Sequence, residues 1–184
     1  MEENFLTNAV SYDDSWLSMP FTGNWKETYY FAKNYIKDNF NKKLSSAMVD
    51  NIKAVLYHLV HNGNAYEDLV LNTAVLYLLV KRTGYDINLI QKNYDKFTYE
   101  GVKLLLDREN PDYLKNTFEN DDFAYLNKIK LAEYIASLNK LTNSKDVFEK
   151  TRKKKLIEHV IKTFDGKTHK GLMTLLKQTL KDFN

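Results

Sequence analysis

The chain has 184 residues and 43% hydrophobic residues, which fit one globular domain with a sizeable core. It contains no cysteine, which excludes disulfides and thiolate metal sites and predicts a reducing, cytoplasmic environment. The net charge of +3 gives little support to nucleic-acid binding, and no apolar run reaches the roughly 18 residues of a membrane-spanning helix.

The first 23 residues mix acidic residues, serine and glycine with isolated aromatic side chains, and they predict an irregular arm. They lack the basic start and apolar block of a secretory signal, so we expect none. The rest of the chain, residues 24–184, shows helical spacing of apolar residues, no period-two alternation and no internal repeat. We therefore predict an irregular arm followed by one all-α domain of eight or nine helices.

Two amphipathic helices are predicted first. Trp25–Phe40 carries apolar residues at helical spacing, and Asn24 is its expected cap. A polar link over residues 41–43 follows, and Ser45 is the expected cap of a second helix. That helix should end at Asn62-Gly63-Asn64.

The central helix is predicted over Leu69–Gly84, where nearly every residue up to Val80 is apolar. A helix that is apolar all round lies inside a soluble core. It ends in Lys81 and Arg82, which face the negative end of the helix dipole, and Gly84 is a typical stop. Further helix starts are expected at Asp86, before Val102, after Asn110-Pro111, at Asp121 or Asp122, at Ser144 and at Thr168.

Two segments carry a family resemblance. Thr73–Thr83 resembles the central helix of the HD-domain hydrolases of the RelA/SpoT type, and Lys130–Leu138 resembles their Lys-Leu-Ala-Asp stretch. Val49–Val55 stands where the family has its first histidine. The resemblance implies an HD-domain-like helical bundle from about Trp25 to Phe183.

An HD site holds a divalent metal, usually manganese, on two histidines and two aspartates, and the metal activates water and polarises phosphate. At those places the resemblance puts residues that bind metal poorly or not at all, and the family's Glu-Asp pair becomes two cations. The degenerate site positions are Asn51, Tyr77, Leu78, Lys81, Arg82, Glu133 and Ser137. The resemblance therefore implies a pseudoenzyme without a metal or another cofactor.

The positive charges allow two interpretations. Lys42, Lys43, Lys81 and Arg82 are candidate anion-binding residues, and the first two lie about where the family contacts its nucleotide. Alternatively, Lys42 and Lys43 are a solvated link, and either Lys81 or Arg82 turns inward to pair with Glu133 and close the cleft. We favour the closed cleft, because a buried cation needs a partner and the resemblance offers only Glu133.

Two other groups of residues have simple structural interpretations. His58 and His61 lie one turn apart without a carboxylate to complete a metal site. The basic run Lys150–Lys155 precedes an apolar stripe, so a solvated helix face is expected rather than a nucleic-acid contact.

The sequence thus predicts a catalytically inactive protein that acts by binding a protein partner or an anionic guanine nucleotide. The alternatives are an altered nucleotide phosphohydrolase of the ppGpp type and a weak nucleic-acid binder. Metal content would separate the first two hypotheses, and the salt dependence of duplex binding would test the third.

Overall fold

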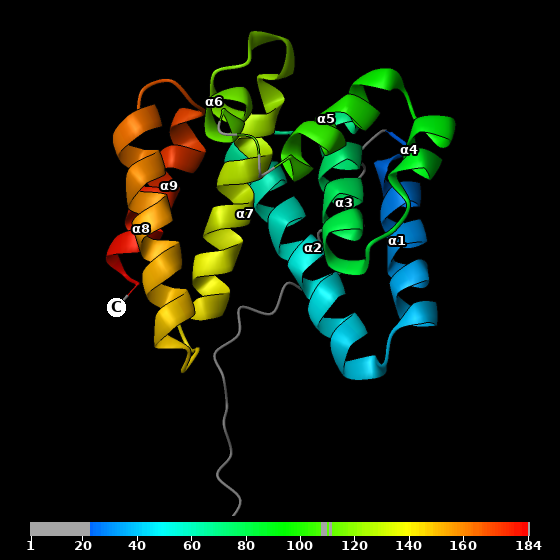
Figure 1. Cartoon of the computed structure of the whole chain (residues 1–184), viewed down its shortest axis with the longest axis horizontal. Coiled ribbons are helices and arrows are strands. Elements are labelled where there is room, and N and C mark those ends of the chain that lie inside the picture. Colours follow the sequence, from blue (N-terminus) through cyan, green and yellow to red (C-terminus); the bar gives the residue numbers. More distant parts are fainter. Residues whose placement is uncertain (1–22, 108–109, 111, 184) are drawn as a thin grey trace, which may run out of the picture.

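A computed structural model describes residues 23–107, 110 and 112–183, and within these ranges the chain is helical without a strand (Figure 1). The all-α prediction is confirmed. All but Gly23 of the predicted arm lies outside the described residues, as does Pro111. The elements are α1 Trp25–Asn39, α2 Lys42–Gly63, α3 Asp68–Thr83, α4 Ile87–Asn93, α5 Lys96–Leu106, α6 Tyr113–Phe118, the 3₁₀ helix η2 Asp121–Phe123, α7 Tyr125–Leu141, α8 Val147–Phe164 and α9 Lys170–Lys181.

Helix α3 is the centre of the larger apolar cluster. It packs against α1, α2 and α5, and Val75, Leu76 and Leu79 are completely buried, as its uninterrupted apolar run predicts. It ends as predicted: Gly84 adopts the left-handed conformation at φ 71°, and its N–H donates to the carbonyl oxygen of Val80. The last turn of α3 thus carries Lys81 and Arg82 out of the core at a defined place.

Helix α7 joins the two halves of the bundle. Figure 1 shows α8 and α9 on one side of the molecule, α1 and α4 on the other, and α7 and α2 between them. One face of α7 enters the cluster around α3 through Ile129 and Ala132, and another enters a second cluster with α8 and α9 through Leu131 and Ile135. Because α7 is covered from both directions, two of its polar side chains, Lys130 and Glu133, lie deep inside the protein.

The cap of α1 differs from the prediction. The side chain of Asn24 makes no capping bond; instead, its Oδ1 accepts a hydrogen bond from Nδ2 of Asn72 at 3.0 Å. The orphan N–H groups of Asn24 and Trp25 donate to the carboxylate of Asp68, at 3.0 and 3.3 Å. The start of α1 is therefore held by the start of α3.

Helix α2 begins earlier than predicted. Asn41, not Ser45, is its cap and accepts a hydrogen bond from the N–H of Leu44 at 3.0 Å. The hydroxyl of Ser45 donates instead to the carbonyl oxygen of Asn41 at 2.9 Å. The expected link is thus wrong at Lys42 and Lys43, which form the first turn of α2.

Later helix starts were predicted to within a few residues. Asp86 caps α4 as predicted. Asp146 rather than Ser144 caps α8, and His169 rather than Thr168 caps α9. The expected start at Asp121 is the short helix η2, before α7 begins at Tyr125.

Candidate functional site

Four polar residues of α3 and α7 meet between the two helices. Tyr77 and Lys81 are four residues apart on α3, and Lys130 and Glu133 are three residues apart on α7, so each pair shares one helix face. We call these four residues the Tyr77–Glu133 cluster. It includes three of the residues that lie at or beside the HD metal-binding motifs in the resemblance.

Every polar atom of the cluster bonds to another member. Oε2 of Glu133 accepts from Nζ of Lys130 at 2.6 Å and from the Tyr77 hydroxyl at 3.0 Å, and Oε1 pairs with Nζ of Lys81. The two ammonium groups also donate to the Tyr77 hydroxyl, Lys81 at 2.9 Å and Lys130 at 2.8 Å. The Tyr77 hydroxyl thus donates once and accepts twice, which is its full capacity.

The cluster is buried and remains charged. Tyr77 is completely buried, and Lys130 and Glu133 are each 2% exposed. Burial alone raises the pKa of Glu133, but Lys130 and Lys81 outweigh it and hold that pKa well below its usual range. Burial likewise lowers the pKa of Lys130, but the charge of Glu133 and the surrounding tyrosines together outweigh this effect, so its pKa is raised.

Two cations share one carboxylate in the cluster, and aromatic rings lie close to both ammonium groups. Nζ of Lys130 lies 5.0 Å from the ring centroid of Tyr77 and 5.5 Å from those of Tyr113 and Tyr134. Nζ of Lys81 lies 5.1 Å from the Tyr77 ring. Because both ammonium groups bond to the Tyr77 hydroxyl, they lie at the edge of that ring. The negative faces that stabilise a cation within about 6 Å are therefore those of Tyr113 and Tyr134, beside Lys130.

The two neighbouring cationic side chains of α3 point in different directions. Lys81 turns inward to Glu133, whereas Arg82 is exposed and donates from Nη2 and Nε to Oδ1 of Asn51, at 3.1 and 3.3 Å. This is the favoured arrangement, in which one cation pairs with Glu133 and the other lies toward solvent.

The other degenerate positions are not part of the cluster. Leu78 is completely buried in the apolar cluster around α3. Ser137 lies one turn beyond Glu133 on α7 and is half-buried. The structure thus brings together Tyr77, Lys81 and Glu133, and separately Arg82 and Asn51.

Lys130 is the residue that the sequence interpretation missed. It was noted only as part of a family-like segment, not as a partner of Glu133. The spacing of three residues to Glu133 was a usable signal, because such residues are neighbours on a helix. Its burial was not readable locally, since the covering rings come from α3, α6 and α7.

The remaining candidates take up other contacts. Nδ1 of His58 lies 3.0 Å from Oδ1 of Asn62, and the ring of His61 packs on Tyr57. Among the described residues, no group of three or more histidine, cysteine, aspartate or glutamate side chains is arranged to hold a metal ion.

In the basic run, Nζ of Lys150 donates to the carbonyl oxygen of Thr142 at 2.8 Å, and Nζ of Lys153 lies 5.8 Å from the Tyr134 ring centroid.

Comparison with family models, curated proteins and solved structures finds no match to this chain. None of the helices in the described ranges combines the length and apolar character that crossing a bilayer requires.

Proposed function

We propose that this protein is a catalytically inactive, HD-hydrolase-like binding protein, in which the Tyr77–Glu133 cluster takes the place of a metal centre. The observation that carries the proposal is the pairing of Glu133 with two lysines deep between α3 and α7. Glu133 is the carboxylate that the resemblance aligns with a metal-binding aspartate. Here its charge stabilises ammonium groups of the protein itself.

The chemistry of the cluster opposes metal-assisted hydrolysis. A divalent cation at Glu133 would have to displace Lys81 and Lys130 and then remain beside their positive charges. Because the pKa of Glu133 is held low, this carboxylate is also a weak base for activating water. These properties argue against the alternative of an altered nucleotide phosphohydrolase.

A protein partner on the outer surface is the favoured mode of binding. The guanine-nucleotide alternative at Lys81 and Arg82 is weakened, because Lys81 is already paired with Glu133 and Arg82 bonds to Asn51. Nucleic-acid binding by the basic run is weakened in the same way, since Lys150 and Lys153 contribute to packing around α7 and α8.

Hydrolysis and metal content test the proposal together. Purified protein incubated with guanosine tetraphosphate and manganese should release no pyrophosphate above the protein-free background. Protein purified without chelators should carry no stoichiometric manganese. Sustained turnover, or manganese bound in proportion to protein, would overturn the proposal and restore the phosphohydrolase alternative.

A further inference from the structure

A basic pocket lies between α1 and α2, on a different side of α2 from Asn51. Its volume is about 470 Å³, and four ammonium groups against one carboxylate give its lining a net charge of +3. The residues that line it are Lys33, Lys37, Phe40, Lys42, Ser45, Ser46, Val49, Asp50 and Lys53. We call it the α1–α2 pocket.

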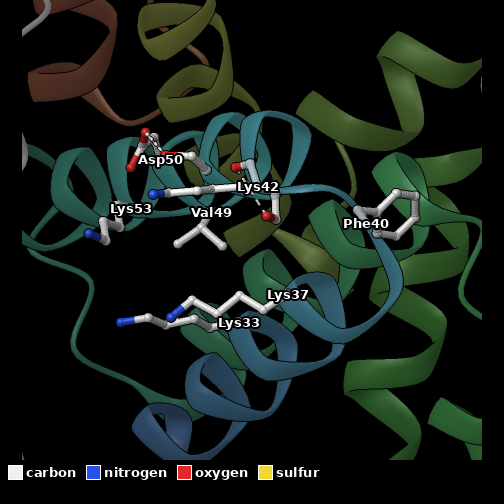
Figure 2. A pocket seen from close by; sticks show the side chains of 9 residues that line it. Lys33, Lys37, Phe40, Lys42, Val49, Asp50 and Lys53 are labelled. Atoms are coloured by element: carbon white, nitrogen blue, oxygen red, sulfur yellow. Dashed lines mark hydrogen bonds between the residues drawn. The ribbon is translucent and has the colours of Figure 1, made fainter.

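The helical repeat gathers the four lysines. Lys33 and Lys37 are four residues apart on α1, and Lys42 and Lys53 are eleven apart on α2, about three full turns. Figure 2 shows the ammonium ends of all four at the same side of the pocket, with Phe40 at the opposite end. The pocket thus has a strongly positive end and an apolar end.

The lining of the pocket offers its four lysines a single carboxylate, that of Asp50. Among the described residues, neither Lys37 nor Lys42 forms an ion pair, and the carboxylate of Asp50 accepts only a 3.4 Å hydrogen bond from Ser46. An anion bound in the pocket would gain the ammonium groups of Lys37 and Lys42 as partners.

We propose that the α1–α2 pocket binds a multivalent phosphate chain. Several ammonium groups at one end match several phosphate groups, because lysine binds phosphate as a point charge without a fixed orientation. Free polyphosphate and nucleoside polyphosphates share this chemistry, and only the latter have a ring system to place near Phe40. The inference goes beyond the proposed function, since the pocket contains no member of the Tyr77–Glu133 cluster.

The site also differs from the anion site that the resemblance implied. That site combined Lys42 and Lys43 with Lys81 and Arg82, and of these four residues only Lys42 lines the pocket. Lys43 is exposed. The two sites therefore make different predictions for a change at Lys43 and the same prediction for Lys42.

Isothermal titration calorimetry with sodium tripolyphosphate tests the proposal on the full chain at about 0.1 M salt, where long-range attraction is screened. Wild-type protein should bind one tripolyphosphate saturably. The double variant Lys37→Ala/Lys42→Ala should bind at least about tenfold more weakly, because two charge-assisted contacts are removed. Lys43→Ala/Lys92→Ala removes the same charge from exposed positions outside the pocket and should retain the wild-type affinity.

The outcomes separate clearly. No saturable binding, or equal weakening in both double variants, would overturn the proposal, since the second result shows either attraction by net charge or binding at the Lys42 and Lys43 site that the resemblance implied. Both variants change exposed side chains, and circular dichroism melting checks that they stay folded.

If ATP or GTP binds more tightly than tripolyphosphate and Phe40→Ala removes the difference, the pocket binds nucleoside polyphosphates. Equal affinities identify the phosphate chain alone as the recognised group.

Discussion

Replacing Glu133 by glutamine tests whether the Tyr77–Glu133 cluster stabilises the fold. Glutamine keeps the shape of the side chain and its hydrogen bond to the Tyr77 hydroxyl, but it removes the only carboxylate of the cluster. Lys81 is 17% exposed along its side chain and can turn toward solvent. Lys130 is 2% exposed and has no such route, so the cost arises mainly from its unpaired charge.

The expected loss is about 3 kcal/mol of unfolding free energy at pH 7. Breaking a buried ion pair by removing one partner costs about 3–5 kcal/mol. The lower end applies here, because Lys130 can lose its proton and still donate a hydrogen bond to Tyr77, and because the rings of Tyr113 and Tyr134 stabilise the cation. A single domain has about 5–15 kcal/mol in total, so the effect is large.

Urea denaturation followed by circular dichroism measures this loss. An equal slope of unfolding free energy against urea concentration in the variant and the wild type shows that both unfold in the same transition. Glu119→Gln is the matched control, since Glu119 forms an exposed ion pair with Lys167 and should leave the midpoint almost unchanged. Equal midpoints for Glu133→Gln and wild type would refute the view that the cluster stabilises the protein.

The pH dependence gives the same test a second readout. The pKa of Glu133 is lowered on folding, so its stabilisation is present above the unfolded value of 4.5 and is lost as pH falls below it. The pKa of Lys130 is raised, so its stabilisation is present below the unfolded value of 10.5 and is lost at higher pH. The difference between wild type and Glu133→Gln should therefore be largest between these limits and should shrink on either side.

Two further predictions concern the core and a buried histidine. Leu76→Ala removes a completely buried side chain at the centre of α3 and should cost about 2–5 kcal/mol in a urea titration; a loss below about 1 kcal/mol would contradict tight packing there. Burial lowers the pKa of His58; the hydrogen bond to Asn62 opposes this shift, and His61 adds a smaller lowering. The stabilisation that the uncharged His58 contributes is therefore present above the unfolded pKa of 6.5 and is lost as pH falls below it. Melting temperatures measured from pH 8 to pH 5 should decline below about pH 6.5 in wild type and less steeply in His58→Gln.

The parts of the fold that local sequence determines were predictable. The long apolar run of α3 and the glycine after it fix both the burial and the end of that helix. The cap of α1 was not predictable in this way, because its acceptor, Asp68, is 44 residues from Asn24 in the sequence. Local propensity identified a helix start correctly, but the tertiary structure supplies the partner for its N–H groups.

The candidate site was likewise predictable in part. The resemblance brought Tyr77, Lys81 and Glu133 into one region, and the need of a buried cation for a carboxylate predicted an ion pair with Glu133. The burial of Lys130 was not predictable, because a lysine near the middle of a helix is normally solvated. Only the packing of α7 between both halves of the bundle turns that position inward.

The choice between Lys81 and Arg82 follows from the helical repeat once Tyr77 is known to face Glu133. At about 100° per residue, Lys81 lies about 40° around the helix axis from Tyr77, whereas Arg82 lies about 140° away. A residue four positions after Tyr77 therefore shares its face, and the next residue points toward the other side, where Asn51 accepts its hydrogen bonds. Exchanging the two residues in the double variant Lys81→Arg/Arg82→Lys keeps the composition and the inward-facing cation. Its stability should thus depend on whether the bulkier guanidinium fits between Tyr77 and Glu133, and not on the loss of the ion pair.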